Sequence, residues 1–92
     1  MQRMKPEVLA RGQQHYRATL NDDNRAVRDP IITAFGMAMT LDGYRPVLVP
    51  SGCTTLRPCP VCAVGRSSYS TLYEKDGARV WACPICETIT DH

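Results

Sequence analysis

The chain has 92 residues, with 11 Lys+Arg against 9 Asp+Glu for a formal net charge of +2, and only 7% of its residues are aromatic. This length fits one domain, or a small domain with an arm. A core with so few aromatic residues needs additional stabilisation from disulfides, a metal or a partner. The length excludes a large multidomain enzyme, and the small net charge excludes a strongly basic DNA-coating protein. A membrane protein is excluded because no apolar run approaches the roughly 20 residues of a membrane span.

The first predicted element is a helix over residues 5–20. Pro6 suits its first turn, and apolar residues recur at helical spacing along one arc. Gly12 weakens this helix, because glycine costs up to about 1 kcal/mol against alanine in a helix interior. The polar run at residues 21–24 ends it.

A second helix is predicted to begin at Asp29, which can cap it, with Pro30 at the first helical position. Gly43 can close it in a left-handed conformation. Neither helix is long enough to be stable alone, so we expect the two to pack as a hairpin. Residues 47–49, between two prolines, form at most a short strand at a sheet edge.

The C-terminal half predicts strands. A strand at residues 53–56 enters it, and residues 68–74 and 78–82 alternate in polarity as strands do. Asp76-Gly77 between the last two is a strong hairpin signal. The predicted fold class is therefore α+β, with a helical arm at residues 1–52 packed on a hairpin at residues 53–92 as one compact unit.

All five cysteines lie in this second half, and four of them form two CPxC motifs: Cys59, Cys62, Cys83 and Cys86. The spacing C-x2-C-x20-C-x2-C is typical of a zinc site. Each motif forms a tight knuckle, and the hairpin returns the second knuckle alongside the first. Four thiolates then fill a tetrahedral site, so we expect one structural Zn²⁺ without a bound water.

Three other uses of these cysteines compete with zinc. Rubredoxin-like iron sites also pair two knuckles, but a glycine usually follows each, where this chain has Ala63 and Glu87. A redox CxxC opens a helix instead of flanking a hairpin. Lasting disulfides are uncommon in the cytoplasm, which we expect to be the location because residues 1–30 lack the apolar region of a signal peptide. The fifth thiol, Cys53, is expected to be a small apolar residue of the entering strand.

The stretches 56–62 and 80–86, with Tyr73 and Asp76-Gly77 between them, resemble the Lar-like restriction-alleviation zinc ribbons of phages and prophages. The resemblance covers about residues 56–88, departs from the family at Ala63 and Glu87, and leaves the helical half without a counterpart. It implies a small phage accessory protein that opposes a host defence system. CRISPR interference is as reasonable a target as restriction.

The arginines are the candidate partner contacts, because their planar guanidinium suits phosphate, carboxylate and aromatic partners. Residues 1–28 carry six basic side chains against three acidic ones. A phosphate-contacting patch and an ordinary solvated face are both consistent with this excess. The candidates are Arg11, Arg17, Arg25 and Arg28 in the arm and Arg57 and Arg79 on the ribbon.

Aromatic residues on the ribbon leave a similar choice. An aromatic and basic face for single-stranded nucleic acid is one interpretation of six ribbon residues: Arg57, Arg66, Arg79, Tyr69, Tyr73 and Trp81. They also fit a role in covering the hairpin against the helices, which we favour for Trp81 because the chain has a single Phe.

No catalytic set is found, so we do not expect an enzyme. The preferred function is a non-catalytic phage-type counter-defence protein, an anti-CRISPR or restriction-alleviation inhibitor that sterically blocks a host protein or ribonucleoprotein complex. Direct contact with a nucleic-acid backbone belongs to the alternative, a zinc-ribbon accessory protein of transcription that binds DNA or RNA. A purely structural subunit of a larger assembly is a third class.

Overall fold

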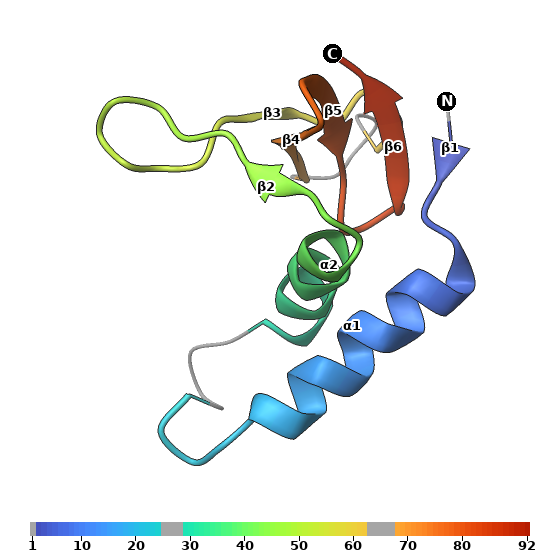
Figure 1. Cartoon of the computed structure of the whole chain (residues 1–92), viewed down its shortest axis with the longest axis vertical. Coiled ribbons are helices and arrows are strands. Elements are labelled where there is room, and N and C mark those ends of the chain that lie inside the picture. The colour runs from blue at the N-terminus through green and yellow to red at the C-terminus, as the bar shows by residue number, and fades with distance from the viewer. Residues whose placement is uncertain (1, 25–28, 63–67) are drawn as a thin grey trace.

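The structure, a computed structural model, describes residues 2–24, 29–62 and 68–92. Within these ranges two helices pack against one face of an antiparallel sheet, so the α+β fold class is confirmed (Figure 1). The elements are β1 Gln2–Arg3, α1 Pro6–Thr19, α2 Pro30–Leu41, β2 Arg45–Pro46, β3 Leu56–Pro58, β4 Tyr69–Lys75, β5 Ala78–Ala82 and β6 Thr88–Asp91. No helix in this part of the chain is long and apolar enough to cross a membrane.

Both helices lie where their capping signals predict. Pro6 begins α1. The carboxylate of Asp29 accepts hydrogen bonds from the amides of Ile31 and Ile32 at 2.9 and 3.0 Å, which satisfies two donors at the start of α2. Gly43 follows α2 with φ +93°, a conformation that favours glycine.

Gly12 is the point at which α1 meets α2. A Cβ added there would clash with the carbonyl oxygen of Ala34 and would lie 2.5 Å from the Cβ of Ala38 and 2.6 Å from its amide nitrogen. The two backbones therefore approach so closely that only glycine fits. Gly12, which weakens the helix predicted from the sequence, is therefore the residue that allows the two helices to pack.

The strands run in the order β1-β6-β5-β4-β2, and β3 pairs with the other end of the β4 edge. The hairpin between β4 and β5 turns at Asp76-Gly77 as predicted, and both residues have positive φ, 52° and 81°. Left-handed values at both positions give the turn whose twist matches the flanking strands.

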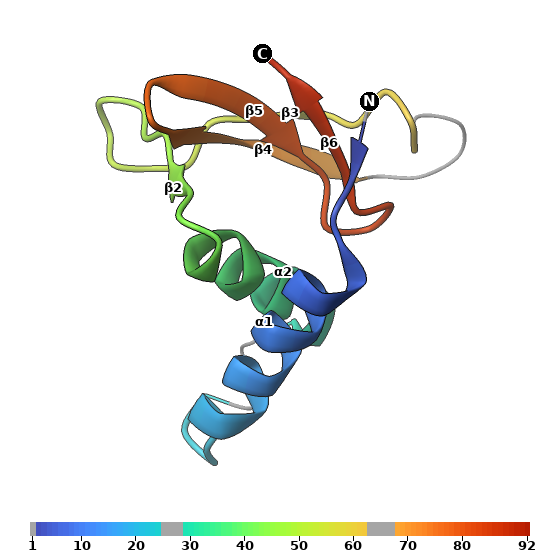
Figure 2. The ribbon, with the colours of Figure 1, turned by 45° about the vertical axis from the view of Figure 1, so that its right-hand side comes forward.

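Alternation along the strands divides the sheet into two faces (Figure 2). Tyr73, Val80 and Ala82 face the helices and share a buried core with Phe35 and Met39. Trp81 occupies the alternate position between Val80 and Ala82, so its side chain lies on the opposite face, where it is half-buried. The prediction that Trp81 fills the core is wrong, because the register places its smaller neighbours there.

The edge of the sheet also differs from the prediction. The strand expected at residues 47–49 is displaced to β2, and the strand expected at 53–56 begins only at Leu56. Residues 47–55 instead form a small projecting hairpin, which we call the tongue. It is held by a bridge between Leu48 and Thr54 and by hydrogen bonds of Val49 to Cys53 and of Gly52 to Val49, at 2.9 and 2.8 Å.

Candidate metal centre

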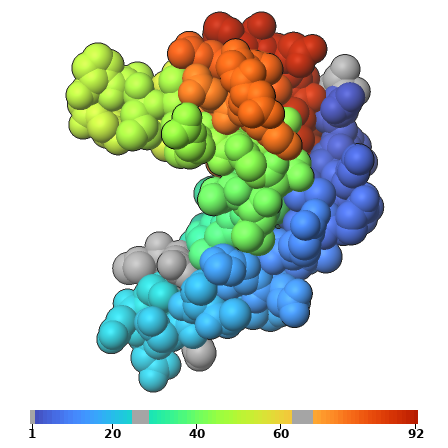
Figure 3. Space-filling model, in the orientation of Figure 1, coloured from blue at the N-terminus to red at the C-terminus, as the bar shows by residue number. Residues whose placement is uncertain are grey.

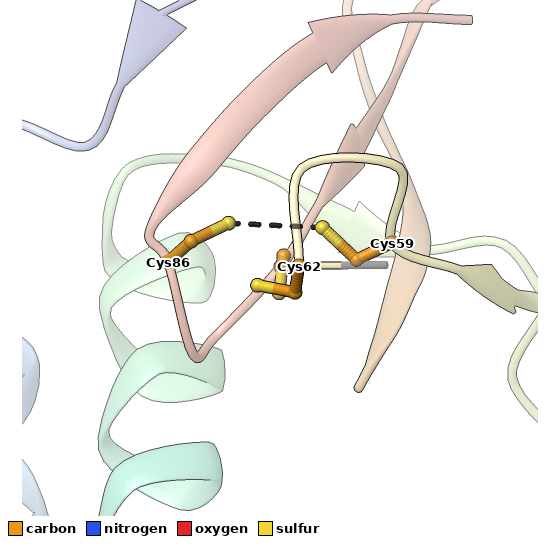
Figure 4. Close-up of side chains that lie close together, drawn as sticks. Cys59, Cys62 and Cys86 are labelled. Carbon is orange, nitrogen blue, oxygen red and sulfur yellow. Dashed lines mark hydrogen bonds between the residues drawn. The ribbon is translucent and has the colours of Figure 1, made fainter. Parts of the chain in front are cut away.

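The four predicted cysteines converge at one end of the sheet, and Figure 4 labels three of them, Cys59, Cys62 and Cys86. Cys59 follows β3 and Cys83 follows β5, and all four sulfurs lie within 4.8 Å of one another. The Sγ atoms of Cys59 and Cys86 are 3.7 Å apart, and those of Cys62 and Cys83 are 3.9 Å apart. A tetrahedron with Zn–S bonds of 2.3 Å has sulfurs about 3.8 Å apart. These two distances match a tetrahedral site, and the four sulfurs together could hold one metal ion.

Backbone hydrogen bonds shape both knuckles. The amide of Cys59 donates to the carbonyl of Ser68, and the amide of Cys83 donates to that of Thr88, both at 3.0 Å. The amide of Glu87 donates a hydrogen bond to the carbonyl of Cys83 at 2.9 Å, which closes the second turn. Glu87 has φ +61°, so it holds the left-handed conformation for which glycine is the usual residue. Ala63, the other departure from glycine, lies outside the described residues.

The cluster is buried apart from the main core. Cys83 is fully buried, Cys59 and Cys62 are nearly so, and Cys86 is half-buried beside them. Burial raises the pKa of Cys83 to about 12 and opposes ionisation of Cys59. At Cys59, however, hydrogen bonds from the amides of Cys62 and Val61 outweigh burial and lower the pKa to about 7. Without a cation, four thiolates in this space would repel one another strongly.

Metal affinity should therefore depend steeply on pH. Cys83, with a pKa of about 12, keeps its proton at neutral pH, and the pKa of Cys62 is also raised, so binding must displace protons from at least these two thiols. The apparent affinity for Zn²⁺ should fall at least about a hundredfold for each pH unit lost. Below pH 7 the slope should steepen, because Cys59 then also carries a proton.

A competition titration with a chromophoric zinc chelator between pH 6 and pH 8 measures this slope. The chelator's own proton affinity is calibrated separately with free zinc. An affinity that does not change over this range would contradict a site made of thiols that ionise only on binding.

Cys53 has no part in the cluster. It lies in the tongue and is exposed, so the expectation of an apolar strand residue is wrong. The strand that was expected to bury it does not form at that position.

The arginines predicted as partner contacts are not gathered on one surface. Arg11 and Arg17 are exposed on α1, where Arg11 lines a cleft with Arg3 and Lys5 while Arg17 lines a separate groove beside Ile31. Arg57 and Arg79 lie on the sheet face that points away from the helices. Arg25 and Arg28 lie outside the described residues, as does Arg66.

The outer sheet face brings together Arg57, Arg79 and Trp81 from the predicted aromatic and basic set, whereas Tyr73 of that set faces the helices. The guanidinium of Arg57 lies 4.6 Å from the ring centroid of Trp81 and donates to Thr90 Oγ1 at 3.2 Å. The ring of His92 lies 5.9 Å from that of Trp81. Arg45 and Arg79 flank Glu74 on the same face, at 3.7 and 3.5 Å. The alternation along each strand indicates which of its side chains share a face. Which side chains of neighbouring strands lie opposite one another follows only from the pairing register.

Comparisons of the chain with protein families, curated proteins and solved structures found no match.

Proposed function

We propose that this chain is a non-catalytic binding protein, held together by one structural zinc ion, that blocks a host nucleoprotein complex. The observation that carries the structural role of the metal is the spacing of the four sulfurs. All four ligand positions would come from protein, which leaves none for water or substrate. Bound there, the metal would supply a rigid cross-link between β3, β5 and β6.

The partner contacts in this proposal are two basic side chains at separate places on α1. Arg11 and Arg17 project from α1, and within the described ranges neither forms an ion pair. Unpaired guanidinium groups on a rigid helix suit phosphate or carboxylate groups of a nucleoprotein. The resemblance of residues 56–88 to restriction-alleviation ribbons supports a phage protein acting in the host cytoplasm against CRISPR interference or restriction. Steric occlusion of the target needs no further chemistry.

Direct nucleic-acid binding is the second candidate, and the Arg57–Trp81 pair favours it. An aromatic ring with a guanidinium beside it, on an open sheet face, is the kind of surface on which unpaired bases stack. Arg3, Arg45 and Arg79 lie on the same face, although Arg45 and Arg79 are partly neutralised by Glu74.

A phage plating assay tests the proposed function. The chain is expressed in one host with active CRISPR interference and in another with an active restriction system, each challenged with a targeted phage. We expect plating to rise at least about tenfold in one of the two hosts. The double variant Arg11→Ala/Arg17→Ala should lose most of this gain, because it removes the charges that meet the partner. Gln14→Ala, an exposed uncharged position on the same helix, is the matched control.

A gel shift with unspecific DNA and RNA at low salt separates the two candidates. Salt-sensitive binding that Trp81→Ala and Arg57→Ala abolish would favour the nucleic-acid protein. No gain in plating in either host would contradict the counter-defence proposal whatever the gel shift shows.

A further inference from the structure

The tongue is an uncharged projection that exposes two apolar side chains, Leu48 and Val49, among small and polar residues. Residues 47–55 contain no charged side chain. Leu48 is 55% exposed and Val49 is 38% exposed. The hairpin is nevertheless fixed at its base, since the amide of Val47 donates to Leu72 at 2.9 Å and Thr55 Oγ1 donates to Val47 at 2.9 Å. Exposed apolar groups on a rigid support are typical of a binding surface.

Beside the tongue lies an open apolar groove of about 720 Å³. Figure 3 shows the molecule hollowed between the yellow-green tongue and the helices. Ile32, Gly36 and Thr40 line the groove from successive turns of α2, and Leu56 and Tyr69 line it from the sheet. Among the described residues that line the groove, none is Asp, Glu, Lys or Arg, in a chain of which 22% of residues are charged.

The groove is large enough to receive the tip of a tongue. Its volume corresponds to roughly two dozen liquid water molecules at about 30 Å³ each. Releasing that water from apolar walls favours association, and an uncharged occupant leaves no buried charge without a partner.

We infer that two copies of this chain pair by exchanging tongues, each tongue seated in the groove of the other copy. The tongue and the groove are contiguous on one molecule, because Thr54 of the tongue also lines the groove. A two-fold axis near Thr54 therefore brings each tongue to the opposite groove at the same time and closes the assembly as a dimer. The occupant matches the groove in its lack of charge, and the same chain supplies it. This inference goes beyond the proposed function and does not depend on it.

Light scattering coupled to size exclusion, over a series of protein concentrations, measures the pairing. We expect a mass of twice 10.2 kDa at high concentration. Leu48→Asp places a carboxylate on the tongue, and Gly36→Leu fills the groove. Each should raise the dimer Kd about 30-fold or more. A Cβ at Gly36 meets only Tyr73 Oη, at 3.8 Å, so Gly36→Leu should fold.

Ile31→Asp is the matched control, because Ile31 is 59% exposed on the same helix but does not line the groove. An acidic residue in the first helical turn is also tolerated. This variant should dimerise like the unmodified chain. Zinc content and circular dichroism verify that each variant is folded.

Mixing the two disruptive variants gives the sharpest result. A mixed dimer of Leu48→Asp and Gly36→Leu keeps one intact tongue in one intact groove, so mixing should restore part of the pairing that each variant alone lacks. A single-chain mass at every concentration would overturn the inference. A dimer that neither variant weakens would overturn it as well. So would a mass that keeps rising with concentration beyond that of two copies.

Discussion

A Cys83→Ser variant is expected to lose its metal and to have no stable folded ribbon at neutral pH. Cys83 is fully buried and joins the end of β5 to the knuckle that leads into β6. A structural zinc site of this kind contributes about 10–16 kcal/mol of apparent binding free energy, as much as the whole stability of a typical domain. The apolar core is small, so it cannot replace that contribution.

Thermal unfolding followed by circular dichroism, together with zinc analysis by mass spectrometry, measures this effect. Cys53→Ser is the matched control, because it removes an exposed thiol outside the cluster and should keep one zinc per chain. Treating the unmodified chain with a strong chelator should reproduce the Cys83→Ser result. A Cys83→Ser protein that melts like Cys53→Ser would contradict the structural role of the metal.

A Gly12→Ala variant is expected to lose about 3 kcal/mol of stability, at the upper end of what overpacking costs. The added methyl group meets the Ala34 carbonyl and the backbone of Ala38, and neither can rotate away as a long side chain would. The helices must move apart, which loosens the packing of α2 on the sheet. For a domain of this size the melting temperature should fall by roughly 12–24 °C.

Gly36→Ala provides the control on the other helix. Its new Cβ lies 3.8 Å from Tyr73 Oη, an ordinary contact, so helix propensity alone should leave the variant unchanged or stabilise it by up to about 1 kcal/mol. Chemical denaturation of both variants in the presence of zinc measures the difference. Equal stabilities would show that the helices do not cross as closely as the structure describes.

Features fixed by a few neighbouring residues were predictable from the sequence. The Asp29-Pro30 start of α2 and the Asp76-Gly77 turn each follow from local backbone chemistry. The convergence of the four cysteines followed from the doubled CPxC spacing, because the hairpin between the two motifs determines where the second one returns.

Features that depend on distant pairing were not predictable. β1 and β2 are two residues each and leave no pattern in the sequence. β6 gains its place only by pairing with β5 and β1. The face occupied by Trp81 depends on the strand register, in which a shift of one residue exchanges core and surface. The arginines predicted as partner contacts lie on different surfaces for the same reason. Arg11 and Arg17 are placed by the helix, whereas Arg57 and Arg79 are placed by the strand register.

The pairing of β1 with β6 determines when the sheet can close. Gln2 lies opposite Ile89 in the ladder, and these residues are 89 − 2 = 87 positions apart. During synthesis α1 and α2 leave the ribosome long before the strand that closes the sheet, and the second pair of cysteines emerges almost as late. The apolar surface of the helices therefore stays uncovered until β6 has emerged, so closure of the sheet and convergence of the four cysteines both come well after synthesis of the helices.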